Sequence, residues 1–191
     1  MKIDTFCSLN FDARLECEAM EEVAYGIAAL FDIDAPRSRI GLIVASDNAG
    51  TATSVQFWSD AMRTGVAVAS PALFPWCLAN APCGVLARRF NVTGPNSTLL
   101  GEGDALLAAL DTASDQLAQG QVDCAVVVAL CFANSQLGGT MLGLRASADG
   151  GNHSQQLDGL YAACNAASLR TAIGLLRVQL GGCAHELRLM Q

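Results

Sequence analysis

The sequence predicts an α/β fold in which a mostly parallel, five-stranded sheet is covered by helices. Short continuous apolar runs, typical of strands buried on both faces, alternate along the chain with segments of helical spacing. This alternation indicates α/β layers around a mostly parallel sheet. With 191 residues the chain is long enough for one sizeable core and too short for two ordinary domains. We therefore expect a single domain over residues 1–191.

The first half of the chain predicts an edge strand or arm, a helix, a buried strand and a second helix, over 1–16, 17–31, 39–45 and 51–64. The first helix is predicted from apolar side chains at helical spacing and from acidic residues in its first turn. The buried strand is one apolar run, RIGLIVA. The segment 70–90 is apolar but contains prolines, and Pro82 fits the first turn of a short helix over about 83–90.

The second half predicts two further strands around a clear helix, and then another strand and helix. The predicted ranges are a strand over 97–100, a helix over 103–120, strands over 124–132 and 140–147, a helix over about 162–178 and a last strand over 183–190. Gly120 ends the helix that precedes the strand 124–132.

Composition and charge exclude several classes of partner. Charged residues make up 15% of the chain and hydrophobic residues 52%, whereas about 25% charged residues is usual for a soluble domain. The sequence has neither an apolar stretch long enough for a bilayer nor the apolar region of a secretory signal. We therefore expect a cytoplasmic protein with a buried core and a large subunit interface. A net charge of −7 without a basic cluster argues against nucleic acid and anionic membranes.

The eight cysteines are expected to be small buried side chains in a reducing compartment. None forms the C-x2-C pair of zinc or thioredoxin-like sites, and we expect no metal and no cofactor. Gly101-Glu102-Gly103 is too short for a phosphate loop, because a third glycine and a lysine are missing. His153, Ser154 and Asp158 are neighbours in a glycine-rich loop, where a catalytic triad is not expected.

Four segments, in the same order along the chain, carry a resemblance to a known family. They are the strand Arg39–Val44, the segment from Ser70-Pro71-Ala72-Leu73-Phe74-Pro75 through Asn80 and Gly84, the turn Phe90–Asn96 with its Gly94-Pro95 pair, and the helix and strand around Ala109-Leu110 and Asp123–Val128. Together they make the stretch 39–132 similar to the N-terminal half of β-ketoacyl synthases. The resemblance implies a thiolase-like layered fold, essentially one half-domain.

The residues that perform the family's chemistry do not match. Active members carry a nucleophilic cysteine nine residues after the glycine of the Gly-Pro turn, at a strand-to-helix elbow. Nine positions after Gly94 this sequence has Gly103, flanked by Glu102 and Asp104, and glycine has no side chain to attack a thioester. Active members also use two catalytic histidines in their C-terminal half. The residues around His153 and His185 do not match those around the family's histidines. The resemblance therefore implies a vacated nucleophile position and a C-terminal catalytic half that is absent or vestigial.

With that departure, the chain resembles the non-catalytic chain-length factors of type II polyketide synthases, in the short form that accompanies aryl polyene synthases. The resemblance implies a heterodimer with an active β-ketoacyl synthase, whose acyl tunnel this subunit would shape in polyene or fatty-acid-like synthesis. Because the chain is acidic, we expect contact with the acyl carrier protein to be indirect. The residues expected at the interface and tunnel are Leu73, Phe74, Trp76, Asn80 and Cys83.

Two other functions stay open at this point. One is a divergent acyltransferase or thioesterase that uses a free cysteine such as Cys83. The other is a structural homodimeric scaffold. Four of the expected interface residues also have a plainer interpretation, since ordinary core positions fit Leu73, Phe74 and Trp76, and a small residue in a packed dimer helix fits Cys83.

Overall fold

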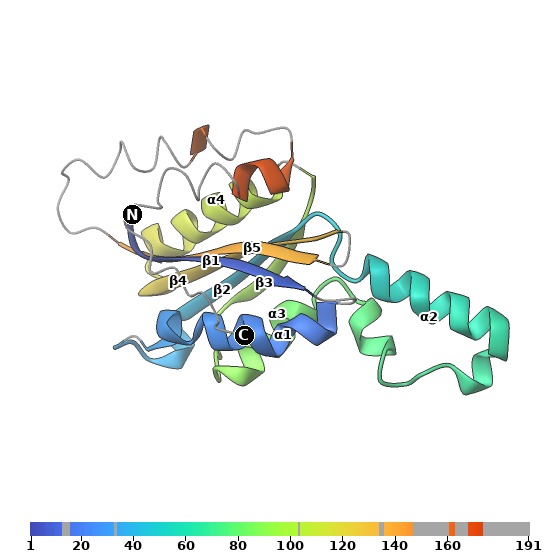
Figure 1. Cartoon of the computed structure of the whole chain (residues 1–191). Helices are drawn as coiled ribbons and strands as arrows, with labels where there is room; N and C mark the ends of the chain where they lie inside the picture. Colours follow the sequence, from blue (N-terminus) through green and yellow to red (C-terminus); the bar gives the residue numbers. More distant parts are fainter. Residues whose placement is uncertain are drawn as a thin grey trace.

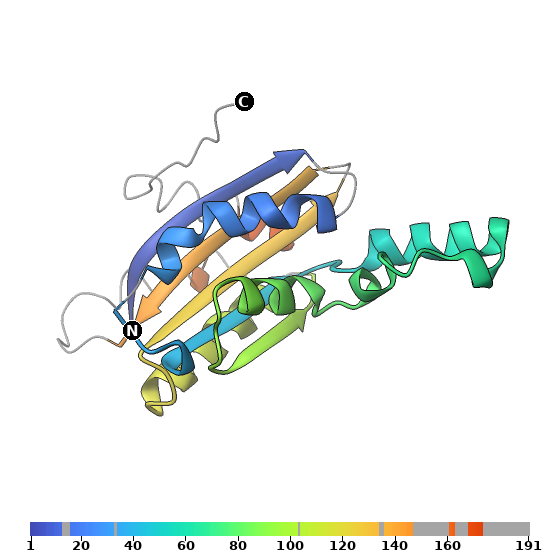
Figure 2. The same ribbon diagram turned by 90° about the horizontal axis from the view of Figure 1, so that it is seen from below.

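The computed structural model describes residues 1–12, 16–32, 34–102, 104–133, 136–146, 161–162 and 168–173. The described residues form a sheet between two layers of helices, shown in Figure 1. Helix α4 (Ala105–Ala118) covers one face, and α1 (Glu16–Gly26) and α3 (Ala81–Arg89) cover the other. Helix α2 (Thr51–Thr64) projects away from this body, as Figures 1 and 2 both show.

The described sheet has five strands in the order β1-β5-β4-β2-β3. Their bounds are β1 Lys2–Asp12, β2 Ile40–Ser46, β3 Asn96–Leu100, β4 Cys124–Ala133 and β5 Gln136–Arg145. β2 pairs in parallel with β3 and β4, whereas β5 is antiparallel to both β4 and β1. The sheet is therefore mixed, and the expectation of a mostly parallel sheet was wrong. The link from Ala133 to Gln136 is far too short for the crossover that a parallel neighbour needs.

Most predicted elements are confirmed, with small shifts at their ends. The edge strand near the N-terminus is β1, and α2 covers the predicted range 51–64. The helix predicted over 17–31 ends at Gly26 and is followed by a 3-10 turn, Ala28–Phe31. β5 begins four residues before the predicted strand 140–147. The strand predicted over 183–190 and most of the helix predicted over 162–178 lie outside the described residues.

The sheet separates two apolar cores. All seven residues of β2 are buried, because neighbouring strands and helices on both faces cover it. Ile43 and Ala45 pack toward α4, whereas Leu42 and Val44 pack toward α1 and α3. The core on the α4 side includes three alanines of the sheet among larger apolar residues. These alanines are Ala45, Ala125 and Ala129.

The Gly94-Pro95 turn determines how β3 lies beside β2. A Cβ atom at Gly94 would lie 2.3 Å from the carbonyl oxygen of Ile40 and 2.9 Å from that of Ser38, so a side chain does not fit here. The N–H of Leu42 donates to the carbonyl of Pro95 at 2.9 Å. This close approach sets the parallel register that brings the end of β3 next to the end of β2.

Candidate functional site

The carboxyl ends of β2, β3 and β4 meet at one edge of the sheet. In the parallel register, Ser46 at the end of β2 lies opposite Leu100 of β3 and Leu130 of β4. The chain reaches β3 on one side of β2 and then returns through α4 to β4 on the other side. Such a switch point at the carboxyl edge is the usual ligand-binding position in α/β sheets.

β3 passes into α4 through a short elbow at this edge. The N–H of Gly101 donates to the carbonyl of Ser46 at 3.1 Å. A Cβ atom at Gly101 would lie 2.3 Å from Asp104 Oδ1, so the Asp104 carboxylate packs over this glycine. Both Glu102 and Asp104 are exposed to solvent. Gly103, where the resemblance places the missing nucleophile, lies outside the described residues.

The turn after β2 is tied to the end of β4 beside the elbow. Asn48 Nδ2 donates to the carbonyl of Phe132, and Asn48 Oδ1 accepts the N–H of Phe132 at 3.2 Å. The Cys131 thiol donates to Asp47 Oδ2 at 3.1 Å. Burial and this carboxylate raise the pKa of Cys131, while Arg170 lowers it. A thiol with a raised pKa is protonated at neutral pH and is a poor nucleophile.

Sequence reasoning missed this cluster. It treated all eight cysteines as small buried side chains and singled out no residue at the end of the strand 39–45. The available signal was their position, because polar residues that directly follow a buried strand lie at the carboxyl edge of the sheet.

Cys83, the residue on which the acyltransferase alternative depends, belongs to the core. It is 2% exposed and packs from α3 with residues of β2 and α1. Its Sγ lies 3.9 Å from the carbonyl oxygen of Leu42, and burial raises the pKa of the thiol. These are the features of a structural cysteine, since reactive cysteines are partly exposed and have lowered pKa values.

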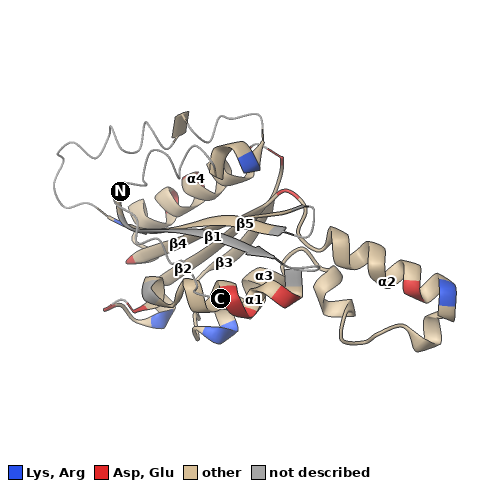
Figure 3. Cartoon of the chain, viewed as in Figure 1, with Lys and Arg blue, Asp and Glu red and all other residues tan. Residues whose placement is uncertain are grey.

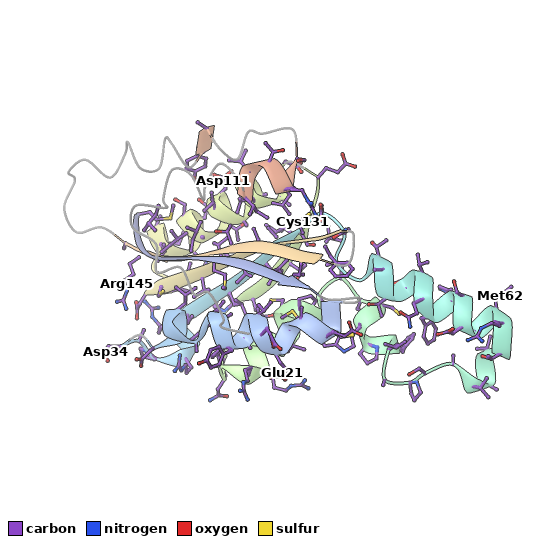
Figure 4. The ribbon with its side chains drawn as sticks, in the orientation of Figure 1. Glu21, Asp34, Met62, Asp111, Cys131 and Arg145 are labelled. Carbon is purple, nitrogen blue, oxygen red and sulfur yellow. The ribbon has the colours of Figure 1, made fainter. Side chains whose placement is uncertain are left out.

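The chain from Thr51 to Leu78 forms a projecting arm. Seven of the nine large apolar side chains that are exposed in the described part of the chain belong to this arm. They are Val55, Trp58, Met62, Val66, Val68, Phe74 and Leu78. Met62 is 81% exposed and lies at the far end of α2 in Figure 4.

The arm is nearly free of charge, as Figure 3 shows. Asp60 and Arg63 are the only charged residues between Thr51 and Leu78, and they pair with each other at 3.0 Å. Within the arm, the start of α2 is joined to the returning chain, because Ser54 Oγ donates to the carbonyl of Cys77 at 3.3 Å. A neutral, apolar projection of this kind differs from an ordinary solvated surface.

The predicted interface residues lie in and below the arm, at different depths. Phe74 is 58% exposed, and its ring centroid lies 5.8 Å from that of Phe57 on α2. Asn80, just before α3, is exposed, whereas Leu73 and Trp76 are half-buried. Trp76 packs partly against the core on the α1 and α3 side, and Cys83 lies within that core.

Sequence reasoning also missed the apolar surface of α2. The helix over 51–64 was predicted, but not which of its faces is exposed. The buried residues of α2 are the small Thr53 and Ala61, so the large side chains of Val55, Trp58 and Met62 point to solvent.

The remaining candidate residues lie in the part of the chain that the structure does not describe. They are His153, Ser154, Asp158 and His185. Within the part of the chain that the structure describes, no three His, Cys, Asp or Glu side chains gather to hold a metal ion. No helix in that part has the length and apolar character needed to cross a membrane.

Comparison with known proteins identifies the family. The family model described as beta-ketoacyl synthase, N-terminal domain, matches residues 9–153. The chain therefore belongs to the β-ketoacyl synthase family, and the part that matches is the N-terminal domain of that family. A search of curated proteins found no match to the sequence.

Solved structures confirm the predicted thiolase-like half-domain. One is the ishigamide ketosynthase/chain length factor, with 13% identity, a TM-score of 0.56, and 77% of this chain and 57% of that chain covered. Another is the ketosynthase ApeO in complex with its chain length factor ApeC from Xenorhabdus doucetiae, with 11% identity, a TM-score of 0.57, and 72% and 63% covered.

A third similar structure is the AntDE:AntF complex, a type II PKS acyl-carrier protein with its ketosynthase bound to the hexaketide. It has 14% identity and a TM-score of 0.53, with 70% of this chain and 45% of that chain covered. This chain thus spans between 45% and 63% of the length of these solved chains. At such identities the likeness is one of fold.

Proposed function

We propose that this chain is a non-catalytic subunit of the chain-length-factor type. It would pair with an active β-ketoacyl synthase in the cytoplasm and shape its acyl tunnel during synthesis of a polyketide-like chain, such as an aryl polyene. The observation that supports this best is the neutral, apolar arm from Thr51 to Leu78. Exposed apolar surface with few charged residues is typical of the core of a large obligate interface.

The sequence at the elbow supports the non-catalytic part of the proposal. Position 103 is glycine. The nearby thiol of Cys131 is 3% exposed and has a raised pKa, so it does not replace the missing cysteine. A chain without an activated nucleophile contributes to acyl elongation through binding and shape.

Leu73 is the residue that we propose to limit the acyl chain. It is half-buried at the base of the arm, beside the exposed Phe74. By resemblance to family dimers, this position reaches across the interface into the partner's tunnel. A large apolar side chain there would stop elongation because it occupies the volume that further acyl carbons need.

The edge of the sheet offers a second surface for the same partner. β3 is the last strand on its side of the described sheet; three of its five residues are half-buried and two are exposed. An edge strand has unpaired backbone groups that a second chain can use. The partner's identity as a synthase is supported by the ketosynthase and chain length factor pairs among the structures of the same fold.

Co-expression with a cysteine-bearing β-ketoacyl synthase tests the proposal. We expect one stable complex of the two chains by size-exclusion chromatography and native mass spectrometry. Trp58→Glu and Met62→Glu should abolish it, since each places a charge on the apolar arm. Tyr25→Glu is the matched control, because Tyr25 is 67% exposed but lies on α1, away from the arm. Within the complex, Leu73→Ala should lengthen the product and Leu73→Trp should shorten it.

Two outcomes would overturn the proposal. A stable monomer or homodimer that leaves the synthase and its products unchanged would favour the scaffold alternative. Stoichiometric acylation of a single cysteine by an acyl thioester, detected by mass spectrometry, would favour the acyltransferase or thioesterase alternative.

A further inference from the structure

The helical segment 168–173 is attached to the backbone of the elbow. The N–H of Leu169 donates to the carbonyl of Glu102 at 2.5 Å. Ser168 stabilises the start of the segment, because its Oγ accepts the N–H of Thr171 at 3.2 Å. A segment that follows β5 by more than twenty residues in the sequence thus returns to the turn between β3 and α4.

The segment is also packed into the core on the α4 side of the sheet. Leu169 and Ala172 are 0% exposed and Ile173 is 4% exposed. They belong to the same apolar cluster as Ile43 of β2 and Ala105 of α4. The opposite side of the segment is exposed at Arg170 and Thr171, so the segment has one buried face and one solvent face.

Arg170 connects the segment to the polar cluster at the carboxyl edge. Arg170 lowers the pKa of the Cys131 thiol, and this thiol donates to Asp47 Oδ2 at 3.1 Å. The segment is therefore hydrogen-bonded to the elbow at Glu102 and shares a core with Cys131 of β4, whose thiol is bonded to Asp47 at the end of β2. Figure 4 shows Cys131 at this end of the sheet.

We propose that segment 168–173 is a built-in plug of the elbow. Side chains of this same chain fill the place at the carboxyl edge where an active family member would present its acyl thioester. The plug turns a potential acyl site into a packed joint between the ends of three strands. The inference rests on the family of the chain and on the contacts above, and it does not depend on the pairing put forward under the proposed function.

Two buried cysteines report on the plug separately from the rest of the fold. Cys131 is 3% exposed and belongs to the core that contains Leu169, whereas Cys83 is 2% exposed and belongs to the core on the other face. Local opening of the plug exposes only the first thiol. Unfolding of the whole domain exposes both.

The experiment is iodoacetamide labelling of the native full chain, followed by peptide mass spectrometry over time. We expect Leu169→Asn to accelerate labelling of Cys131 by about tenfold or more and to leave Cys83 protected. Thr171→Asn is the matched control, since it introduces the same side chain on the exposed face of the segment. Neither substitution adds a charge near the thiol.

The results separate the plug from the other possibilities. Cys131 that reacts as fast in the unchanged chain as the half-buried Cys77 overturns the plug, and so does Cys131 that stays protected in folded Leu169→Asn. If Leu169→Asn exposes both thiols, the milder Leu169→Ala must expose Cys131 before Cys83 for the plug to stand. The two proposals can fail separately. If the chain binds no synthase, the proposed pairing is overturned, and protection of Cys131 in that same chain still supports the plug.

Discussion

Arg39 and Asp123, 84 positions apart in the sequence, form a forked ion pair that joins the start of β2 to the turn before β4. Arg39 Nη2 lies 2.6 Å from Asp123 Oδ1, and Arg39 Nε lies 3.2 Å from both carboxylate oxygens. Arg39 Nη1 also donates to the carbonyl of Gly120 at 2.8 Å, and the N–H of Asp123 donates to the carbonyl of Arg39. The pair therefore holds the two central strands in register at the end opposite the elbow.

This pair predicts a stability that depends on pH. The hydrogen bond from Arg39 lowers the pKa of the Asp123 carboxyl below its ordinary value of 3.8. Its stabilisation is fully present above that value and is lost as the pH falls through the lower pKa of the folded chain. Asp123→Asn should therefore lower the Tm at pH 7, and the gap to the unchanged chain should close in acid. Arg39→Lys keeps the charge and loses the fork. In that background, Asp123→Asn should lower the Tm at pH 7 by less than it does in the unchanged chain. A gap that is the same at every pH would show that the ion pair does not contribute.

The Gly94-Pro95 turn predicts a large and local effect of one methyl group. Gly94→Ala should lower the free energy of unfolding by about 3 kcal/mol or more, because its Cβ would collide with backbone oxygens that cannot move without distorting β2. Gly84→Ala is the control, since it lies in α3 with no atom within 4 Å of the added Cβ. That change should stabilise the chain by up to about 1 kcal/mol. Urea unfolding midpoints measure both effects, and equal stability of the two variants would contradict the packing at Gly94.

Cys83 is expected to behave as a packing residue. Cys83→Ala should lower the free energy of unfolding by about 1 kcal/mol, since it removes one buried atom from the core between α3 and β2. It should leave binding of a synthase unchanged. Iodoacetamide should label the half-buried Cys77 well before Cys83 in the native chain. An acyl group found on Cys83 of the folded chain would contradict this assignment.

The buried elements were predictable from the sequence because their patterns are local. β2 is a continuous apolar run with strands and helices on every side, and α4 has apolar residues at helical spacing, so each pattern has one structural solution. β5 was harder to place. Gly138 and Gly139 favour a turn when taken alone, yet they lie inside a strand that is paired on both sides, with β4 and β1. Pairing with distant strands determines that this segment is a strand, and local propensity carries no information about that pairing.

The candidate site was predictable only in part, for a related reason. The Gly-Pro turn and the elbow are consecutive in the sequence, so their resemblance to the family located them. The plug brings Leu169 to Glu102 and to the core of Cys131, and no spacing in the sequence connects these three residues before the chain folds. The exposure of α2 was hidden because its buried face is made of small residues, Thr53 and Ala61.

The lack of charge on the arm has a consequence for the chain before it finds a partner. Proteins commonly keep apolar segments from self-association by placing charged residues beside them as gatekeepers. Over α2 the only charges, Asp60 and Arg63, neutralise each other. No charge repulsion therefore keeps the arms of two copies apart, and newly made copies would associate through them. We expect the chain alone to self-associate reversibly as its concentration rises, and a partner that covers the arm to prevent this association.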